Sequence, residues 1–265
     1  MAEAARGLRP PLKWAGGKRW QIPLLEPIWT RHSGRRLVEP FCGGMAITLG
    51  LRPSSALLND INPHVINFYR WLQRGLVILD DMPNSRTGYY SRRSRFNRLL
   101  ASGGADTAEA AGLFYYLNRT GYNGLCRFNR RGDMNVPFGR YGRIAYTTDF
   151  SSYRAPFEGW EFRSVDFEEL ELDNGDFICA DPPYDVEFRQ YSSQPFDWED
   201  QERVALWLSR HRGPVVLSNQ ATPRILHLYK SLGFDVRPID APRRISCNGN
   251  RAAAIEVLAV RNLER

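Results

Sequence analysis

A polar turn, Asp181-Pro182-Pro183-Tyr184, follows the apolar run Phe177-Ile178-Cys179-Ala180. Asp181 offers a carboxylate that can accept hydrogen bonds from an amino group, and Tyr184 offers a flat face on which a base can stack. The two prolines stiffen the turn and donate no hydrogen bond. The apolar run predicts a buried parallel strand, and open α/β sheets bind ligands at the carboxyl ends of such strands. The turn therefore favours methyl transfer to an amine on a planar ring; an ordinary turn after a strand is the alternative.

A second candidate site lies near the N-terminus, in residues 12–18 (LKWAGGK). The ring of Trp14, beside two glycines, can lie against a flat or sulfonium-bearing ligand. Lys18 is expected just inside a helix start, where it can meet a carboxylate with help from the helix dipole. A basic N-terminal arm with one core tryptophan is the alternative interpretation.

The next segment predicts a βαβ unit with a glycine turn. Its strands are expected at residues 37–41 and 56–60, and its helix at 45–51. In nucleotide-binding units of this kind, glycines occupy the first turn and an acid after the second strand binds a ribose hydroxyl. Gly43 and Asp60 approximate this arrangement. A packing glycine and a surface aspartate are the alternative.

Residues 61–149 have a different, basic character. Helical apolar spacing is present at 65–76 and 108–118, and a cluster of arginines lies between them, at Arg92, Arg93, Arg95 and Arg98. Residues 126–129 and 134–136 predict a β-hairpin around the turn at 130–133. Two-stranded ribbons fit the DNA major groove, where arginine reads guanine, while Arg130 and Arg131 at the turn are placed to contact phosphates. A solvated basic hairpin is the alternative.

The α/β pattern returns after residue 149. Strands are expected at 160–162, 177–180, 214–217 and 253–258, and an amphipathic helix at 199–210. Strands and helices on both sides of a basic segment predict an α/β, Rossmann-like doubly wound sheet that carries a mainly helical insertion with a β-hairpin. We expect residues 1–61 and 150–265 to form the catalytic domain and 62–149 the insertion.

Composition adds information about partners and compartment. The chain of 265 residues has a net charge of +7 and a pI near 9.4, which suits a polyanion, although a solvated basic surface is the alternative. No apolar stretch is long enough for a bilayer, and no secretory signal is recognisable. The cysteines, Cys42, Cys126, Cys179 and Cys247, lack metal-ligand spacing. We therefore expect a cytoplasmic protein with reduced thiols, no metal and no membrane partner.

Six segments together resemble the Dam-type DNA adenine methyltransferases. They occur in the family's order over nearly the whole chain: LKWAGGK (12–18), LVEPFCGG (37–44), NDIN (59–62), LNRTGYNGLCRFNRRGDMNVPFGRY (117–141), DPPY (181–184) and RRISCNGNR (243–251). LKWAGGK, YNGLCRFN and NVPFGRY are highly specific strings, whereas DPPY alone is shared by several methyltransferase classes. The resemblance implies S-adenosyl-L-methionine as methyl donor, adenine in double-stranded DNA as acceptor, a flipped target base, and a monomer in solution.

The matching positions also imply roles for single residues. The turn at Asp181, Pro182, Pro183 and Tyr184 would be catalytic. The cofactor would be held by Trp14, Lys18, Glu39, Phe41, Gly43, Asp60, Asp166, Phe167 and Asp181, with Lys18 near its carboxylate, Asp60 at its ribose, and Asp166 or Phe167 near its adenine. DNA would be contacted by Lys13, Tyr122, Asn123, Leu125, Arg127, Arg130, Pro137 and Tyr141, of which Leu125, Arg127 and Pro137 match positions that read GATC.

The chain departs from the family at two places. The family's glycine turn reads F-x-G-x-G, and its last glycine is replaced by Met45. The loop from Asp185 to Asp197 is also shorter, and we expect Tyr191 and Phe196 to border the target base. Two other functions stay open at this point: an amino methyltransferase for cytosine, RNA or protein glutamine, and a DNA-binding regulator without catalysis. A restriction-modification, viral or housekeeping role is equally open.

Overall fold

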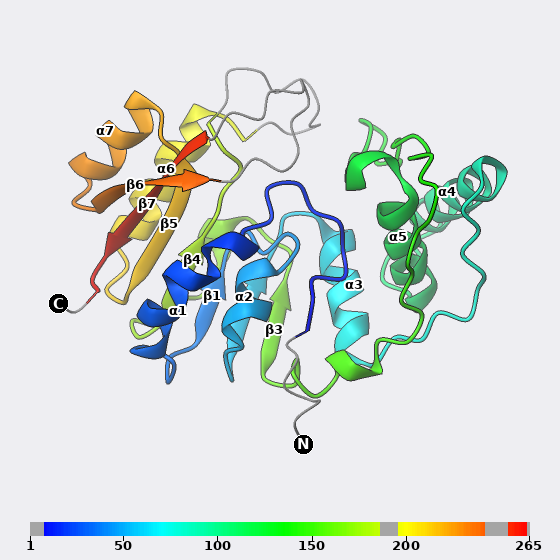
Figure 1. Cartoon of the computed structure of the whole chain (residues 1–265), viewed down its shortest axis with the longest axis horizontal. Coiled ribbons are helices and arrows are strands. Elements are labelled where there is room, and N and C mark those ends of the chain that lie inside the picture. Colours follow the sequence, from blue (N-terminus) through cyan, green and yellow to red (C-terminus); the bar gives the residue numbers. More distant parts are fainter. Residues whose placement is uncertain (1–7, 186–195, 242–253, 264–265) are drawn as a thin grey trace.

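A mixed sheet of seven strands forms the centre of the described part of the chain. The computed structural model describes residues 8–185, 196–241 and 254–263. The strand order is β3-β2-β1-β4-β5-β7-β6, where β7 is antiparallel to both of its neighbours and the other pairs are parallel (Figure 1). The strands are β1 (Leu37–Glu39), β2 (Ala56–Asn59), β3 (Trp160–Arg163), β4 (Phe177–Ala180), β5 (Val215–Gln220), β6 (Asp235–Ala241) and β7 (Ala254–Arg261).

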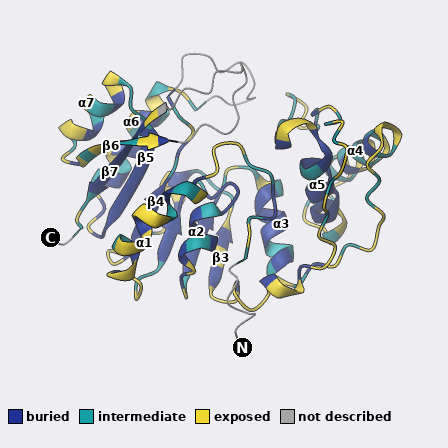
Figure 2. Cartoon of the chain, viewed as in Figure 1, coloured by how far each residue is buried: buried dark blue, intermediate teal, exposed yellow. Residues whose placement is uncertain are grey.

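Helices cover both faces of this sheet, because the central strands are apolar on both sides. Every residue of β1, β2 and β4 is buried (Figure 2). Alternate residues of one strand belong to different cores: Leu37 packs with α1, α2 and α3, whereas Val38 packs with α6 and α7. The helices are α1 (Ile22–Thr30), α2 (Ala46–Leu51), α3 (Pro63–Gln73), α4 (Arg86–Ala101), α5 (Ala108–Thr120), α6 (Trp198–Ser209) and α7 (Pro223–Ser231). The predicted mixed α/β sheet with helices on both faces is confirmed.

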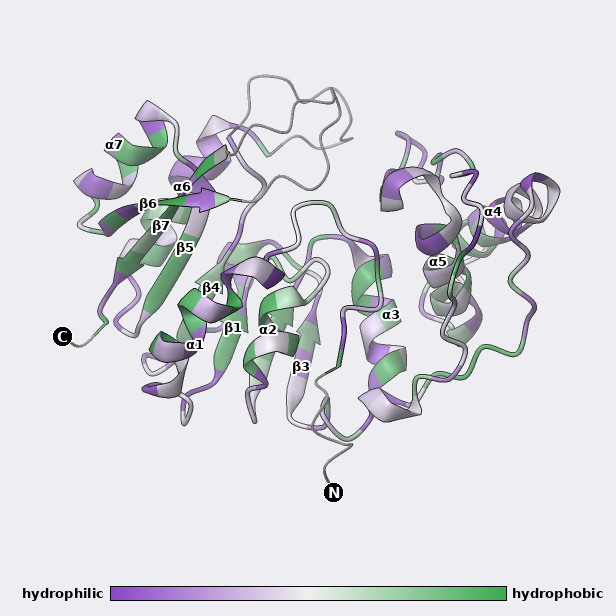
Figure 3. Ribbon diagram, viewed as in Figure 1, coloured by the Kyte–Doolittle hydropathy of each residue, from purple (hydrophilic) through white to green (hydrophobic). Residues whose placement is uncertain are grey.

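Helices α4 and α5 lie beyond α3, at the opposite end of the molecule from α7 (Figure 1). Aromatic side chains join them to α3: the ring of Phe68 stacks on that of Tyr115 with centroids 5.6 Å apart, and His64 meets Phe96 edge to face. The apolar residues of α4 and α5 are therefore continuous with one core of the sheet. Hydrophobic and hydrophilic stretches alternate along α3, which lies between this core and α5 (Figure 3).

The segment expected to form a hairpin lacks continuous strands. One isolated antiparallel bridge pairs Phe128 with Met134, and the backbone N–H of Asn129 donates to the carbonyl of Asp133 at 2.9 Å. The side-chain oxygen of Asn129 also accepts from the backbone N–H groups of Arg131 and Asp133, so local side-chain bonds take the place of a longer ladder.

Several other expectations differ from the structure in their boundaries. Helix α3 begins at Pro63 and ends at Gln73, earlier at both ends than the expected 65–76. The earlier start follows from Asn62, whose side chain caps the backbone N–H of His64. The first strand ends at Glu39 and not at residue 41. Helices α4 and α7 and strand β6 were not predicted. A helix was expected to start just before Lys18, but Lys18 precedes a 3-10 turn, Arg19–Gln21, and α1 begins only at Ile22.

Candidate active site

A cavity of about 370 Å³ lies at the carboxyl ends of β1, β2 and β4. The parallel register places Val38 beside Leu57 on one side and beside Ile178 on the other, so the residues that follow these strands meet at one edge. The cavity brings together most residues expected to be catalytic or to bind the cofactor, namely Trp14, Lys18, Glu39, Phe41, Gly43, Asp60, Asp181, Pro182, Pro183 and Tyr184.

The glycine turn after β1 is shaped by its contact with Trp14. Gly43 has a φ of +41°, a conformation that side chains with a Cβ adopt rarely. A Cβ on Gly43 would lie 2.4 Å from the indole nitrogen of Trp14, and one on Gly44 would lie 2.8 Å from the Cβ of Trp14. The two glycines are therefore needed for the indole to reach its place in the cavity wall.

Two carboxylates of the cavity are bound by backbone N–H groups. One oxygen of Asp60 accepts from the N–H of Gly43 at 3.0 Å, and the other accepts from that of Asn62 at 2.9 Å. Glu39 accepts from the backbone N–H of Thr48 at 2.7 Å and from its hydroxyl. Burial nevertheless raises the pKa of Asp60 to about 6 and that of Glu39 to about 8, because a low-polarity environment disfavours charge.

The third carboxylate, that of Asp181, has an oxygen without a hydrogen bond. Its Oδ1 is buried and accepts no hydrogen bond from the described residues, although it forms an ion pair with Nζ of Lys18 at 3.5 Å. Burial raises the pKa of Asp181 to about 7, and the charge of Lys18 opposes this rise. Asp181 can therefore accept a hydrogen bond from a ligand.

Tyr184 and Lys18 share a partner that was not predicted from the sequence. The hydroxyl of Tyr184 donates to Oε2 of Glu256 at 2.6 Å, and Nζ of Lys18 lies 3.3 Å from both oxygens of Glu256. Nζ of Lys18 also lies 4.2 Å from the centre of the Tyr184 ring. The sequence offered one signal for this role of Glu256, namely an acid inside the last apolar strand. It gave no indication of the partners, because Lys18 and Tyr184 are far away in the sequence.

The Pro-Pro turn is held by two further residues that sequence reasoning missed. The side-chain amide of Gln201 on α6 donates to the carbonyl of Pro183 at 2.7 Å, and Asn219 on β5 donates to the amide oxygen of Gln201 at 2.8 Å. Asn219 is fully buried. A polar run at the end of β5 was the only sequence signal for this support.

Two residues expected near the cofactor adenine lie behind the cavity wall. The buried ring of Phe167 packs on Phe41 with centroids 5.5 Å apart, and Asp166 forms an ion pair with Arg203 at 2.9 Å. Their contact with the cofactor stays a prediction. Of the loop residues expected at the target base, Phe196 packs against Phe41, at 5.7 Å, and Tyr191 lies outside the described residues, as do RRISCNGNR and Cys247.

A second cavity, of about 550 Å³, adjoins the first and is lined by Leu125 and Arg127. Trp14, Asp60 and Ile61 belong to the walls of both cavities. The segment expected to read DNA therefore lies directly beside the carboxylate-lined cavity.

Comparison with known proteins agrees with this geometry. The profile of D12 class N6 adenine-specific DNA methyltransferases matches residues 14–245. The chain belongs to this family.

It is 36% identical to the DNA N-6-adenine-methyltransferase of Escherichia phage P1, a match that covers 97% of this chain and 36% of the longer phage protein. It is 33% identical to the DNA adenine methylase of Escherichia coli (strain K12), over 93% of this chain and 92% of that one. A type II methyltransferase of Lactococcus lactis subsp. cremoris, M1.LlaDCHI, is 31% identical over 96% and 95%. The expected family and the expected enzyme class, an adenine-specific DNA methyltransferase, are thus confirmed.

A buried amide joins the two cavities of this methyltransferase. The side chain of Asn118, at the end of α5, accepts from the backbone N–H of Lys13 at 2.8 Å and donates to the carbonyl of Lys13 at 2.9 Å. It also donates to the carbonyl of Gly124 at 3.2 Å. Asn118 therefore links the segment that carries Trp14 to the turn that precedes Leu125.

Most residues expected to contact DNA are grouped around this junction. Nζ of Lys13 donates to the carbonyl of Arg119 at 2.7 Å and lies 3.6 Å from the Tyr141 ring centre, and burial lowers its pKa to about 8. The backbone N–H of Tyr122 donates to the carbonyl of Pro137 at 2.9 Å, and that of Asn123 donates to the Tyr141 hydroxyl at 2.8 Å. The Tyr122 side chain is 49% exposed.

The remaining two expected DNA contacts lie further along the segment. Arg127 is braced by Asn135, whose side-chain oxygen accepts from its Nε at 2.8 Å. Arg130 is exposed at the turn between Phe128 and Met134, outside the walls of both cavities.

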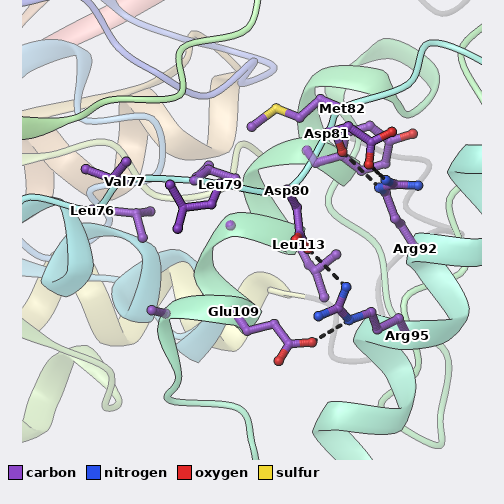
Figure 4. Close-up of a pocket in the computed structure, with 14 residues that line it drawn as sticks. Leu76, Val77, Leu79, Asp80, Asp81, Met82, Arg92, Arg95, Glu109 and Leu113 are labelled. Carbon is purple, nitrogen blue, oxygen red and sulfur yellow. Dashed lines mark hydrogen bonds and ion pairs between the residues drawn. The ribbon is translucent and has the colours of Figure 1, made fainter.

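The methyltransferase has a third cavity, of about 230 Å³, between α4, α5 and residues 76–82 (Figure 4). Its arginines are paired with acids: Arg92 with Asp81, and Arg95 with Asp80 at 3.0 Å and Glu109 at 2.5 Å. Two of the four arginines in the basic cluster therefore form ion pairs. These pairs join α4 to the segment that precedes it and to α5.

No three His, Cys, Asp or Glu side chains of the described residues are grouped so that they could hold a metal ion. Within the same residues, none of the helices has the length and apolar character needed to cross a bilayer.

Replacing Asn118 by alanine should destabilise the enzyme by about 3 kcal/mol, because three backbone groups, one buried and two partly buried, lose their partner. Urea unfolding measures this change. The matched control is Asn84→Ala, which removes one hydrogen bond at the surface, to the carbonyl of Tyr141, and should cost less than about 1 kcal/mol. Equal losses in the two variants would contradict a special role for the junction.

Proposed function

We propose that this enzyme transfers the methyl group of S-adenosyl-L-methionine to the exocyclic amine of an adenine that is flipped out of duplex DNA, within GATC. The observation that carries the proposal is that Oδ1 of Asp181, at the edge of a carboxylate-lined cavity, accepts no hydrogen bond from the described residues. Family membership supports adenine as the acceptor. An amine inside a duplex is out of reach, so the base must leave the stack.

The cavity fits the proposed methyl donor in charge and shape. Its described walls contain three acids, Glu39, Asp60 and Asp181, and one cation, Lys18. A donor with a positive sulfonium and a negative carboxylate suits this distribution. Lys18 would meet the carboxylate, Asp60 would accept from the ribose hydroxyls, and Trp14 would lie against the donor. Bound there, the donor would supply an electrophilic methyl group.

Around the target base, residues of the turn would do the chemistry. The lone pair of an adenine amine is delocalised, so the nitrogen is a poor nucleophile. Asp181 and the carbonyl of Pro182 would accept its two hydrogens and stabilise the positive charge that develops on nitrogen. Tyr184 would stack on the ring and align the amine, and alignment alone contributes several kcal/mol. Asp181 would take the proton after methyl transfer, when the amine is far more acidic.

Recognition of the target sequence is assigned to residues 62–149, as an inserted unit that includes the hairpin-like segment. Leu125, Arg127 and Pro137 would read GATC, with Tyr122 and Asn123 beside the flipped base. The brace from Asn135 supports this role of Arg127, because it uses only part of the guanidinium and leaves N–H groups for a base edge. Lys13, Arg130 and Tyr141 would contact the DNA backbone. The enzyme would act as a monomer.

Expression of the enzyme in cells that lack adenine methylation should make plasmid DNA resistant to a restriction enzyme blocked by methylation at GATC. Sequencing that detects methylated adenine should find the modification at these sites. Methylation of adenine in another sequence would refute only the proposed target sequence, GATC. Methylated cytosine, or the absence of any methylated base, would refute the proposed reaction. The Asp181→Ala variant provides the background level.

Replacing Asp181 by alanine should abolish methyl transfer, because the amine loses its main acceptor, while DNA affinity should stay within about twofold. Transfer is followed with radiolabelled donor, and DNA affinity by fluorescence anisotropy. Asp173→Ala is a suitable control, since its side chain is 84% exposed and lies outside the cavity wall. Near-normal turnover of Asp181→Ala would rule out this mechanism.

Methyl transfer should slow as the pH falls below about 7, the raised pKa of Asp181. Protonation removes the carboxylate that accepts the amine hydrogens, so kcat/KM for the donor should fall about tenfold per pH unit on the acid side and level off above it. Melting temperatures over the same pH range identify any loss due to unfolding. A flat profile between pH 5.5 and 8 would exclude a titrating Asp181.

A further inference from the structure

Glu256 lies in an unusual place for an acid. It belongs to β7, between Gln220 of β5 and Ile239 of β6, and its side chain is only 10% exposed. The three residues that follow it, Val257 to Ala259, are buried and apolar. A buried carboxylate is costly unless it is paired, so its partners indicate why it is there.

Its partners are the residues that build the catalytic cavity. Oε2 accepts from the hydroxyl of Tyr184 at 2.6 Å, both oxygens lie 3.3 Å from Nζ of Lys18, and Gln21 donates to Oε2 at 3.4 Å. Tyr184 and Lys18 line the cavity, whereas Glu256 is not part of its wall. Any influence of Glu256 on a ligand must therefore pass through these two side chains.

The same contacts determine where the Lys18 ammonium lies. It is 3.3 Å from Glu256 and 3.5 Å from Oδ1 of Asp181, so the two carboxylates compete for one cation. If Glu256 lost its charge, Lys18 would be drawn closer to Asp181 and would hydrogen-bond to the Oδ1 atom that it now meets as an ion pair at 3.5 Å. The Tyr184 ring would lose the bond that fixes its hydroxyl end.

We propose that Glu256 is a positioning residue for methyl transfer: it holds the Tyr184 ring for the target base and shares the Lys18 ammonium with Asp181, so that Lys18 does not bind the acceptor oxygen of Asp181 more closely. This inference rests on the proposed function, because it assigns the amine to Asp181 and the donor's carboxylate to Lys18. It adds a residue of the last strand to a site whose other residues lie on the N-terminal segment and at the carboxyl ends of β1, β2 and β4.

The test compares Glu256→Gln, which keeps the shape and removes the charge, with the purified wild-type enzyme. The single-turnover rate at saturating donor and DNA should fall at least about tenfold, and donor affinity measured by calorimetry without DNA should weaken about fivefold. DNA affinity should stay within about twofold. Glu161→Gln is the matched control, since Glu161 lies on β3 with a side chain that is 55% exposed, and it should change none of these values.

A double-mutant cycle with Tyr184→Phe separates positioning from simple stabilisation. Because Glu256 acts partly through the Tyr184 hydroxyl, the rate effect of Glu256→Gln should be smaller in the Tyr184→Phe background than in wild type. Fully additive effects would overturn the proposal. So would a lowered melting temperature with an unchanged single-turnover rate of the folded enzyme.

Two further outcomes are decided in advance. If Glu256→Gln does not fold, Glu256→Asp replaces it: this variant retains the charge but not the reach to Tyr184, and it should slow transfer less than about tenfold while donor affinity stays within about twofold. An unchanged rate in that variant overturns the proposal.

If wild type methylates no adenine, the proposed function fails, and donor affinity alone decides the role of Glu256: a fivefold loss in Glu256→Gln supports it, and no loss refutes it.

Discussion

The proposed catalytic cavity is lined by more acidic than basic side chains, and its properties follow from this imbalance. Glu39, Asp60 and Asp181 end or follow three neighbouring strands, and Lys18 is the one cation among the described wall residues. Burial raises the pKa of each acid, because little water is present to stabilise the charge. A positively charged ligand would relieve this cost. The proposed sulfonium donor meets that requirement, and its neutral thioether product does not, so the same imbalance favours release of the product.

The position of Lys18 connects this electrostatic constraint to the fold. The N-terminal segment can bring Lys18 to the sheet only because Gly43 and Gly44 let Trp14 approach the turn after β1. The same segment is bonded through Lys13 to Asn118, and from there to the turn before Leu125. DNA bound along that turn would therefore sit at a fixed distance from the cavity, without any separate device to align substrate and donor.

Sequence reasoning found the parts of the site that are encoded locally. Gly43, Asp60 and Asp181 were predicted because each follows a short apolar strand, and the topology of a parallel sheet brings such positions together. Glu256 was missed because its partners lie 72 to 238 residues away in the sequence. Asn118 was missed because its partners lie 6 and 105 residues away. No spacing rule encodes such contacts. Helix α4 was missed for another reason: only Tyr89 and Phe96 are buried along it, too few to give a clear helical period.

Met45 shows how this chain accommodates its departure from the family's glycine pattern. The residue caps α2 with φ 55° and ψ 35°, the left-handed conformation for which glycine is suited. A side chain there costs about 1–2 kcal/mol. The Met45 side chain is fully buried in the core, which contributes about 1.5–3 kcal/mol and offsets that strain. The backbone N–H of Met45 still donates to the carbonyl of Cys42, at 2.7 Å, and the hydroxyl of Tyr69 donates to the carbonyl of Gly43. Met45 therefore adopts the conformation for which glycine is suited, and the turn at Gly43 is held by these two hydrogen bonds.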